Sequence, residues 1–180
     1  MQIFDKTFKE IISAQTIPLI GGLLAGTILA FFTDQLILIP GLLIILPGFL
    51  ELRGSVSGSI ASRLSSGLFL KAINPRHVPK SIIRGNVLAS FFLVTLVSFF
   101  LGLIALLATF LLTKIFVWKL LFLPVLAAII ADIIETPITM FLTLYFFRKG
   151  HDPNNIMGPF ITSTGDLTSV LALVLVILLL

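Results

Sequence analysis

The chain has 180 residues, of which 58% are hydrophobic and only 11% charged, and its mean hydropathy is +1.18. This composition excludes an ordinary soluble domain and indicates one integral membrane domain spanning residues 1–180. The chain contains no cysteine, which excludes disulfides and thiolate metal sites. Because the net charge of +4 fits loops that orient a protein in a bilayer, we expect membrane lipid, and no nucleic acid, as a partner.

The first 16 residues are too interrupted by charge to be a signal peptide. Their apolar residues fall at helical spacing, which predicts an amphipathic helix on the membrane surface over residues 1–16. A helical extension of the first span explains the pattern equally well. The residues that carry the pattern are Ile3, Phe4, Phe8, Ile11 and Ile12.

Long apolar segments predict an all-α, multi-pass protein of the cell membrane with five transmembrane helices. The predicted spans cover about residues 17–33, 36–70, 87–112, 120–147 and 156–180. Each segment can cross a hydrocarbon layer of about 30 Å at about 1.5 Å per residue.

Lysine and arginine predict the orientation, because cytoplasmic loops carry an excess of both. Segments that alternate to one side contain eight of them, and the other side contains two. The N-terminus is therefore predicted to be cytoplasmic and the C-terminus to lie outside. The eight are Lys6, Lys9, Lys71, Arg76, Lys80, Arg84, Arg148 and Lys149, and the two are Lys114 and Lys119.

The second apolar segment is unusual in length and composition. As one straight helix, residues 36–70 would extend about 52 Å, which exceeds the thickness of the bilayer. Pro40 and Pro47 lie in its apolar half, and its other half is polar. Irregular backbone at membrane depth needs protein or water around it, so we expect a kinked or broken helix beside a polar path. The alternative is a helix that extends into the cytoplasm.

Polar residues at helical spacing form one stripe on each of the last two spans. Asp166 lies about 15 Å from the inner end of the fifth span, and Asp132 about 18 Å from the outer end of the fourth. A carboxylate at such depth costs about 2.5–3.5 kcal/mol on insertion scales, so it needs a partner or a function. The stripes consist of Asn155, Pro159, Thr162, Asp166 and Ser169, and of Asp132, Glu135, Thr136, Thr139 and Thr143.

Three of these residues are acids, and we expect no arginine or lysine beside them, since Arg53 is expected to pair with Glu51. Carboxylates without a counter-charge take up protons or bind cations, and oxygen ligands suit magnesium. The alternative for Asp132 and Glu135 is a hydrogen bond to a neighbouring helix. The candidate metal ligands are Asp166, Thr162, Asp132, Glu135 and Asn155, and the candidate pathway-lining residues are Ser55, Ser59, Ser169 and Thr136.

Two pairs of glycines four residues apart predict close helix contacts. One pair is Gly22 and Gly26 in the first span, and the other is Gly54 and Gly58 in the second. A serine row at helical spacing (Ser55, Ser59, Ser62 and Ser66) follows on the second span.

Three stretches resemble motifs of the membrane domain of MgtE-type magnesium transporters and the related solute carrier family 41. The first, residues 47–66, reads PGFLELRGSVSGSIASRLSS and resembles the second-span motif of that family. The second, Asp152-Pro-Asn-Asn-Ile156, resembles the loop before the last span. The third, Pro159-Phe-Ile-Thr-Ser-Thr-Gly-Asp166, resembles the motif within that span.

The resemblance implies a magnesium pathway on a two-fold axis, lined by the second and fifth spans, with Asp166 as the central ligand. Solute carrier 41 proteins carry two copies of this domain and this chain carries one, so a homodimer is expected. Ser55 stands where the family usually has asparagine, which weakens a ligand role there. The cytoplasmic sensing domains of bacterial MgtE proteins are not part of these residues, so their magnesium-gated closure is not implied. Sodium or protons could be coupling ions, with Asp132 and Glu135 as candidates for their site.

Two other functions remain open from the residues alone. One is an ion-coupled carrier of another small solute. The other is an intramembrane aspartyl protease, since Asp132 and Asp166 lie on adjacent spans. The residues before both aspartates depart from the protease motifs, so the favoured interpretation is a divalent cation transporter that is not an enzyme.

Overall fold

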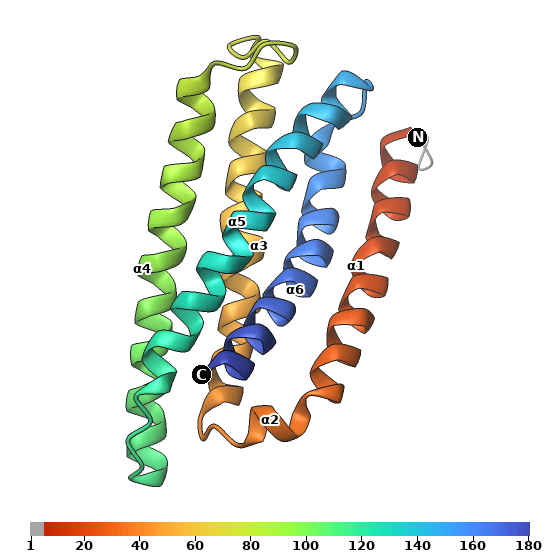
Figure 1. The fold of residues 1–180 in the computed structure, drawn as a ribbon. Helices are drawn as coiled ribbons and strands as arrows, with labels where there is room; N and C mark the ends of the chain where they lie inside the picture. Colours follow the sequence, from red (N-terminus) through yellow and green to blue (C-terminus); the bar gives the residue numbers. More distant parts are fainter. Residues whose placement is uncertain (1–5) are drawn as a thin grey trace.

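The computed structural model describes residues 6–180, which form a bundle of helices (Figure 1). Five of these helices are long and apolar enough to cross a membrane, which confirms the predicted all-helical class and the number of spans. The remaining helix, α2, is short. The bounds are α1 (Lys6–Phe31), α2 (Thr33–Ile37), α3 (Leu42–Phe69), α4 (Lys80–Thr113), α5 (Lys119–Arg148) and α6 (Pro153–Leu179).

The long helices run alternately up and down (Figure 1). The start of α1, the α3–α4 connection and the α5–α6 connection lie at one end of the bundle, and α2 and the C-terminus lie at the other. Helices α3, α5 and α6 pack against one another and α4 packs against α3 and α5, whereas α1 stands at the edge and contacts α6. The segments rich in lysine and arginine therefore share one end of the bundle.

The first helix is continuous from Lys6 to Phe31. It passes through residue 16 and contains Pro18 without a break. In the part of the chain that the structure describes, the segment before the first span is therefore continuous with that span, and the interfacial helix over residues 1–16 stays a prediction. The other residues assigned to an interfacial helix, 1–5, lie outside the described residues.

The interruption expected in the second apolar segment lies between α2 and α3. Gly41 has a φ of 83°, and a Cβ there would overlap the side chain of Thr109, so glycine suits the turn on both counts. Helix α3 then continues from Leu42 to Phe69 through Pro47 and through the whole polar half. The polar motif therefore lies on unbroken helix, with the broken backbone before it.

The largest group of buried apolar residues joins α3, α4, α5 and α6. Phe49 and Leu42 of α3 meet Leu120 and Leu123 of α5 in this group, and all four side chains are fully buried. Gly102 of α4 faces the backbone of α5, where a Cβ would meet the Leu120 carbonyl. In membrane bundles, glycine usually allows two helices to approach this closely.

Candidate functional site

A cavity of about 500 Å³ lies between α3 and α6. Its polar lining consists of two carboxylates, Glu51 and Asp166, and two hydroxyls, Ser55 and Thr162. The resemblance implied a path with walls from the second and fifth spans, and this cavity has those two walls. Its other lining residues are Pro47, Leu50, Gly54, Gly58, Gly158 and Ile161.

Asp166 lies at the middle of α6, thirteen residues after Pro153 and thirteen before Leu179. At about 1.5 Å per residue, this position is about 20 Å from either end of the helix. The carboxylate is partly exposed, and no side chain within residues 6–180 forms a hydrogen bond or ion pair with it. A carboxylate at this depth without a protein partner is costly unless it takes up a proton or meets water or a cation in the cavity.

Thr162 lies one helical turn before Asp166 and lines the same cavity. Its hydroxyl donates to the Gly158 carbonyl at 3.0 Å, which leaves oxygen lone pairs available to a ligand. Glycine makes the rest of this wall open, because a Cβ at Gly54, Gly58 or Gly158 would meet nothing within 4 Å. The predicted close contact at Gly54 and Gly58 is therefore absent within the described chain, and the same holds for Gly22 and Gly26.

A second cavity, of about 370 Å³, lies on the α4 side of α3. Ser59 lines this cavity, together with Leu93 and Val97 of α4. Glu51 and Ser55 line both cavities. Two of the predicted pathway residues, Ser55 and Ser59, therefore lie beside open volume on α3.

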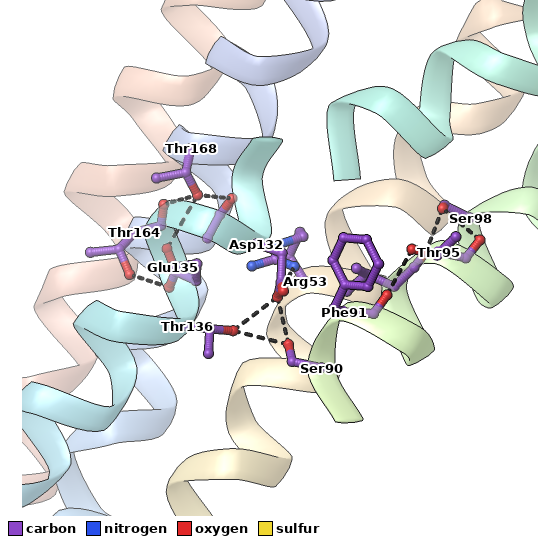
Figure 2. Close-up of polar contacts among 12 residues, drawn as sticks. Arg53, Ser90, Phe91, Thr95, Ser98, Asp132, Glu135, Thr136, Thr164 and Thr168 are labelled. Atoms are coloured by element: carbon purple, nitrogen blue, oxygen red, sulfur yellow. Dashed lines mark hydrogen bonds and ion pairs between the residues drawn. The ribbon is translucent and has the colours of Figure 1, made fainter. Parts of the chain in front are cut away.

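The expectation that no arginine neutralises the acids of the fourth span is wrong, as is the expected pairing of Arg53 with Glu51. The fully buried Arg53 guanidinium lies 3.1 Å from the Asp132 carboxylate, whose side chain is 4% exposed (Figure 2). The same oxygen of Asp132 accepts hydrogen bonds from Ser90 at 2.5 Å and Thr136 at 2.9 Å. The pair forms because Arg53 points into the bundle from α3, whereas Glu51 is exposed.

Glu135 is also fully buried, and it faces α6 rather than the cavity. Its carboxylate accepts hydrogen bonds from Thr164 at 2.8 Å and Thr168 at 3.2 Å (Figure 2). The acidic stripe of α5 thus lies inside the bundle, as the hydrogen-bonding alternative expected. Neither Asp132 nor Glu135 lines either cavity.

Three further candidates from the sequence lie away from both cavities. Thr136 is buried and shares hydrogen bonds with Asp132 and Ser90. Ser169 is fully buried, and its hydroxyl has no hydrogen-bond partner among the described residues. Asn155 lies in the first turn of α6, where the Asp152 side chain caps the helix by accepting from the backbone N–H of Asn154 at 2.9 Å.

Glu51 is the polar lining residue of the larger cavity that was not predicted from the sequence. The serine row on the second span has a four-residue step from Ser55 to Ser59, and one step backward from Ser55 reaches Glu51. Extending the row would have placed this glutamate on the same face. Glu51 was not counted in the row because it was expected to pair with Arg53.

No group of three histidine, cysteine, aspartate or glutamate side chains within residues 6–180 is close enough to hold a metal ion. A cation in the larger cavity would therefore meet only two carboxylates of one chain, plus hydroxyls and retained water. Magnesium accepts such a site, because it is usually bound through one or two carboxylates and keeps several waters.

Comparison with known proteins identifies the family. A search of curated proteins gave no match. The family model of the MgtE divalent cation transporters matches residues 46–176, which contain α4, α5, all but the first turn of α3 and nearly all of α6. This family transports ions and is not an enzyme, so the protease alternative is excluded. The chain therefore belongs to the MgtE family of divalent cation transporters.

Proposed function

We propose that this protein transports magnesium across the membrane along the cavity between α3 and α6, with Asp166 as the central ligand. The observation that supports this most directly is the unpaired carboxylate of Asp166 at mid-helix, beside a polar cavity of about 500 Å³. In lipid such a charge would be costly, and a visiting divalent cation removes the cost.

The donors suit a hard cation. Asp166 offers a carboxylate, and Thr162 and Ser55 offer hydroxyl oxygens on the same cavity. A water molecule occupies about 30 Å³ in the liquid, so the cavity has room for an ion with much of its hydration shell. Magnesium dehydrates reluctantly and would pass such a site with waters retained.

A homodimer completes the pathway. One chain supplies two walls, from α3 and α6, and the glycines of these walls face open space. A second copy on a two-fold axis would cover this face with an identical surface and bring two Asp166 side chains across the path. The alternation of basic segments supports an N-terminus on the cytoplasmic side.

The test is magnesium uptake by the protein in liposomes, with Asp166→Asn beside Asp34→Asn. Asp34 lies on α2, is exposed and lies outside the cavity, so its change removes the same charge elsewhere. Uptake is expected to be lost in Asp166→Asn and retained in Asp34→Asn, with both variants eluting as the wild-type oligomer. Unchanged uptake by a folded Asp166→Asn protein would refute the role of this residue.

The wild-type protein should also gain thermal stability from magnesium, because a ligand that binds only the folded state shifts the unfolding equilibrium. The gain should disappear in Asp166→Asn and persist in Asp34→Asn. The same assay with magnesium, manganese, cobalt and calcium ranks these ions by the thermal stability that each adds.

A further inference from the structure

We propose that Glu51 is a second acidic residue of the cation path, which strengthens divalent ion binding and favours divalent over monovalent ions. This inference rests on the proposed function and extends it to a residue on the opposite wall from Asp166. Four observations support it: the place of Glu51 in the membrane, the absence of a partner, its position between two cavities, and the direction in which Arg53 points.

Glu51 lies within the membrane-spanning part of α3. It follows Leu42, the first residue of the helix, by nine positions, or about 14 Å along the axis. The residues around it are largely apolar, including Phe49, Leu50 and Leu52. A glutamate at such a depth is costly unless it faces a polar environment.

No hydrogen bond or ion pair joins the exposed side chain of Glu51 to another described residue. The nearest arginine in sequence, Arg53, is fully buried on the other side of α3 and is paired with Asp132. The next, Arg63, is twelve residues further along the same helix, or about 18 Å away along the axis. The chain therefore provides no cation of its own on α3 for Glu51.

Because Glu51 lies between the two cavities, its carboxylate can bind an ion in either of them. It lines the 500 Å³ cavity with Asp166 and Thr162, and the 370 Å³ cavity with Ser59. Ser55, one turn further along α3, also lines both. Glu51, Ser55 and Ser59 thus form a row of oxygen donors along α3, and an ion leaving Asp166 can follow this row.

A second carboxylate changes the choice of ion as well as the strength of binding. The energy of attraction between a fixed charge and an ion is proportional to the charge of the ion. Each added carboxylate therefore attracts a divalent ion with twice the energy with which it attracts a monovalent ion at the same distance. Glu51 and Asp166 together place two negative charges on facing walls. In a homodimer the number would be four.

The first experiment measures magnesium binding and the ratio of magnesium to sodium uptake in the full-length protein, with Glu51→Gln beside Glu51→Asp. The loss of one nearby charge is expected to weaken magnesium binding by about tenfold or more and to lower the uptake ratio. Glu51→Asp keeps the charge and should retain most of both. Wild-type affinity and uptake ratio in folded Glu51→Gln would overturn the inference.

Asp166→Asn in the same assay separates the two proposals. If Asp166→Asn abolishes uptake while Glu51→Gln changes neither affinity nor uptake ratio, only the inference about Glu51 fails. If Asp166→Asn has no effect, the proposed function fails as well.

The second experiment uses the absence of cysteine in the chain and does not depend on transport. The thiol of Glu51→Cys should react with a charged, water-soluble methanethiosulfonate, and magnesium should slow this reaction. Leu43→Cys is the control, since Leu43 is an exposed apolar residue of α3 outside both cavities. An unreactive thiol at position 51, or a reaction rate that magnesium does not change, would contradict the assignment even if Glu51→Gln failed to fold.

Discussion

Arg53 Nη1 lies 3.1 Å from Asp132 Oδ1, and this buried pair joins α3 to α5 behind the walls of the cavity. On α3, Arg53 is followed directly by Gly54 and Ser55, which line the cavity. On α6, a Cβ at Gly165 would lie 3.6 Å from the Cβ of Arg53. The ion pair therefore fixes the α3 wall to α5 from inside the bundle, at the level where Gly165 of α6 approaches Arg53.

Breaking this pair from one side should destabilise the fold more than replacing both partners. Arg53→Leu or Asp132→Leu alone leaves one charge buried without its counter-charge, which typically costs about 3–5 kcal/mol. The double variant Arg53→Leu/Asp132→Leu should recover most of that loss, because apolar pairs of similar volume substitute well for buried ion pairs. Thermal unfolding of the three purified variants in detergent measures the coupling.

Arg63→Leu is the matched control for this series, since Arg63 lies on the same helix and is exposed. Its melting temperature should stay near that of the wild type. A double variant as unstable as the sum of both single variants would show that Arg53 and Asp132 act independently.

Glu135→Gln should retain magnesium uptake within about twofold, because its side chain still accepts a hydrogen bond from Thr164 or Thr168. Glu135 is a candidate ligand by its place in the sequence, and the structure places it away from the cavity. Uptake into liposomes, measured beside Asp166→Asn, distinguishes the two roles. A folded Glu135→Gln protein without uptake would restore Glu135 to the path or to a coupling site.

Gly21 fixes the contact between α1 and α6, since a Cβ there would overlap Ser163 on α6. Gly21→Val should lower stability by about 1–3 kcal/mol, as overpacking usually does. Gly22→Val is the neighbouring control, because a Cβ at Gly22 meets nothing within 4 Å. Equal melting temperatures for the two variants would show that α1 moves away from α6 at little cost.

Gly58→Leu tests the homodimer. A Cβ at Gly58 meets nothing within 4 Å in one chain, so we expect the variant to fold, while its added volume lies on the open face beside the cavity. We expect a weakened dimer and reduced uptake, observed by size-exclusion chromatography with light scattering and by the liposome assay. In a separate variant, Gly58→Cys should form a disulfide between two copies under mild oxidation.

Gly85→Leu is the control for this change, because Gly85 on α4 also has open space and lies outside the cavity. If Gly58→Leu remains a fully active dimer, the glycine face of α3 is not the interface.

Hydropathy and length alone determined the class of the protein and its five spans, because each segment must bury its backbone in hydrocarbon by itself. The motif around Asp166 also identified the family from local residues. The length of the second segment and its prolines predicted an interruption, but only the structure placed it between α2 and α3, where Gly41 has a positive φ and packs against Thr109 on another helix.

The partners of the acids were decided only by the tertiary structure. Helical spacing grouped Asp132, Glu135 and Thr136 on one face but could not say whether that face met the cavity or the bundle interior. Arg53 and Glu51 are two residues apart, and on a helix such neighbours point in different directions. The fold therefore turned Arg53 toward Asp132, 79 positions away in the chain, and left Glu51 beside Asp166 on the cavity.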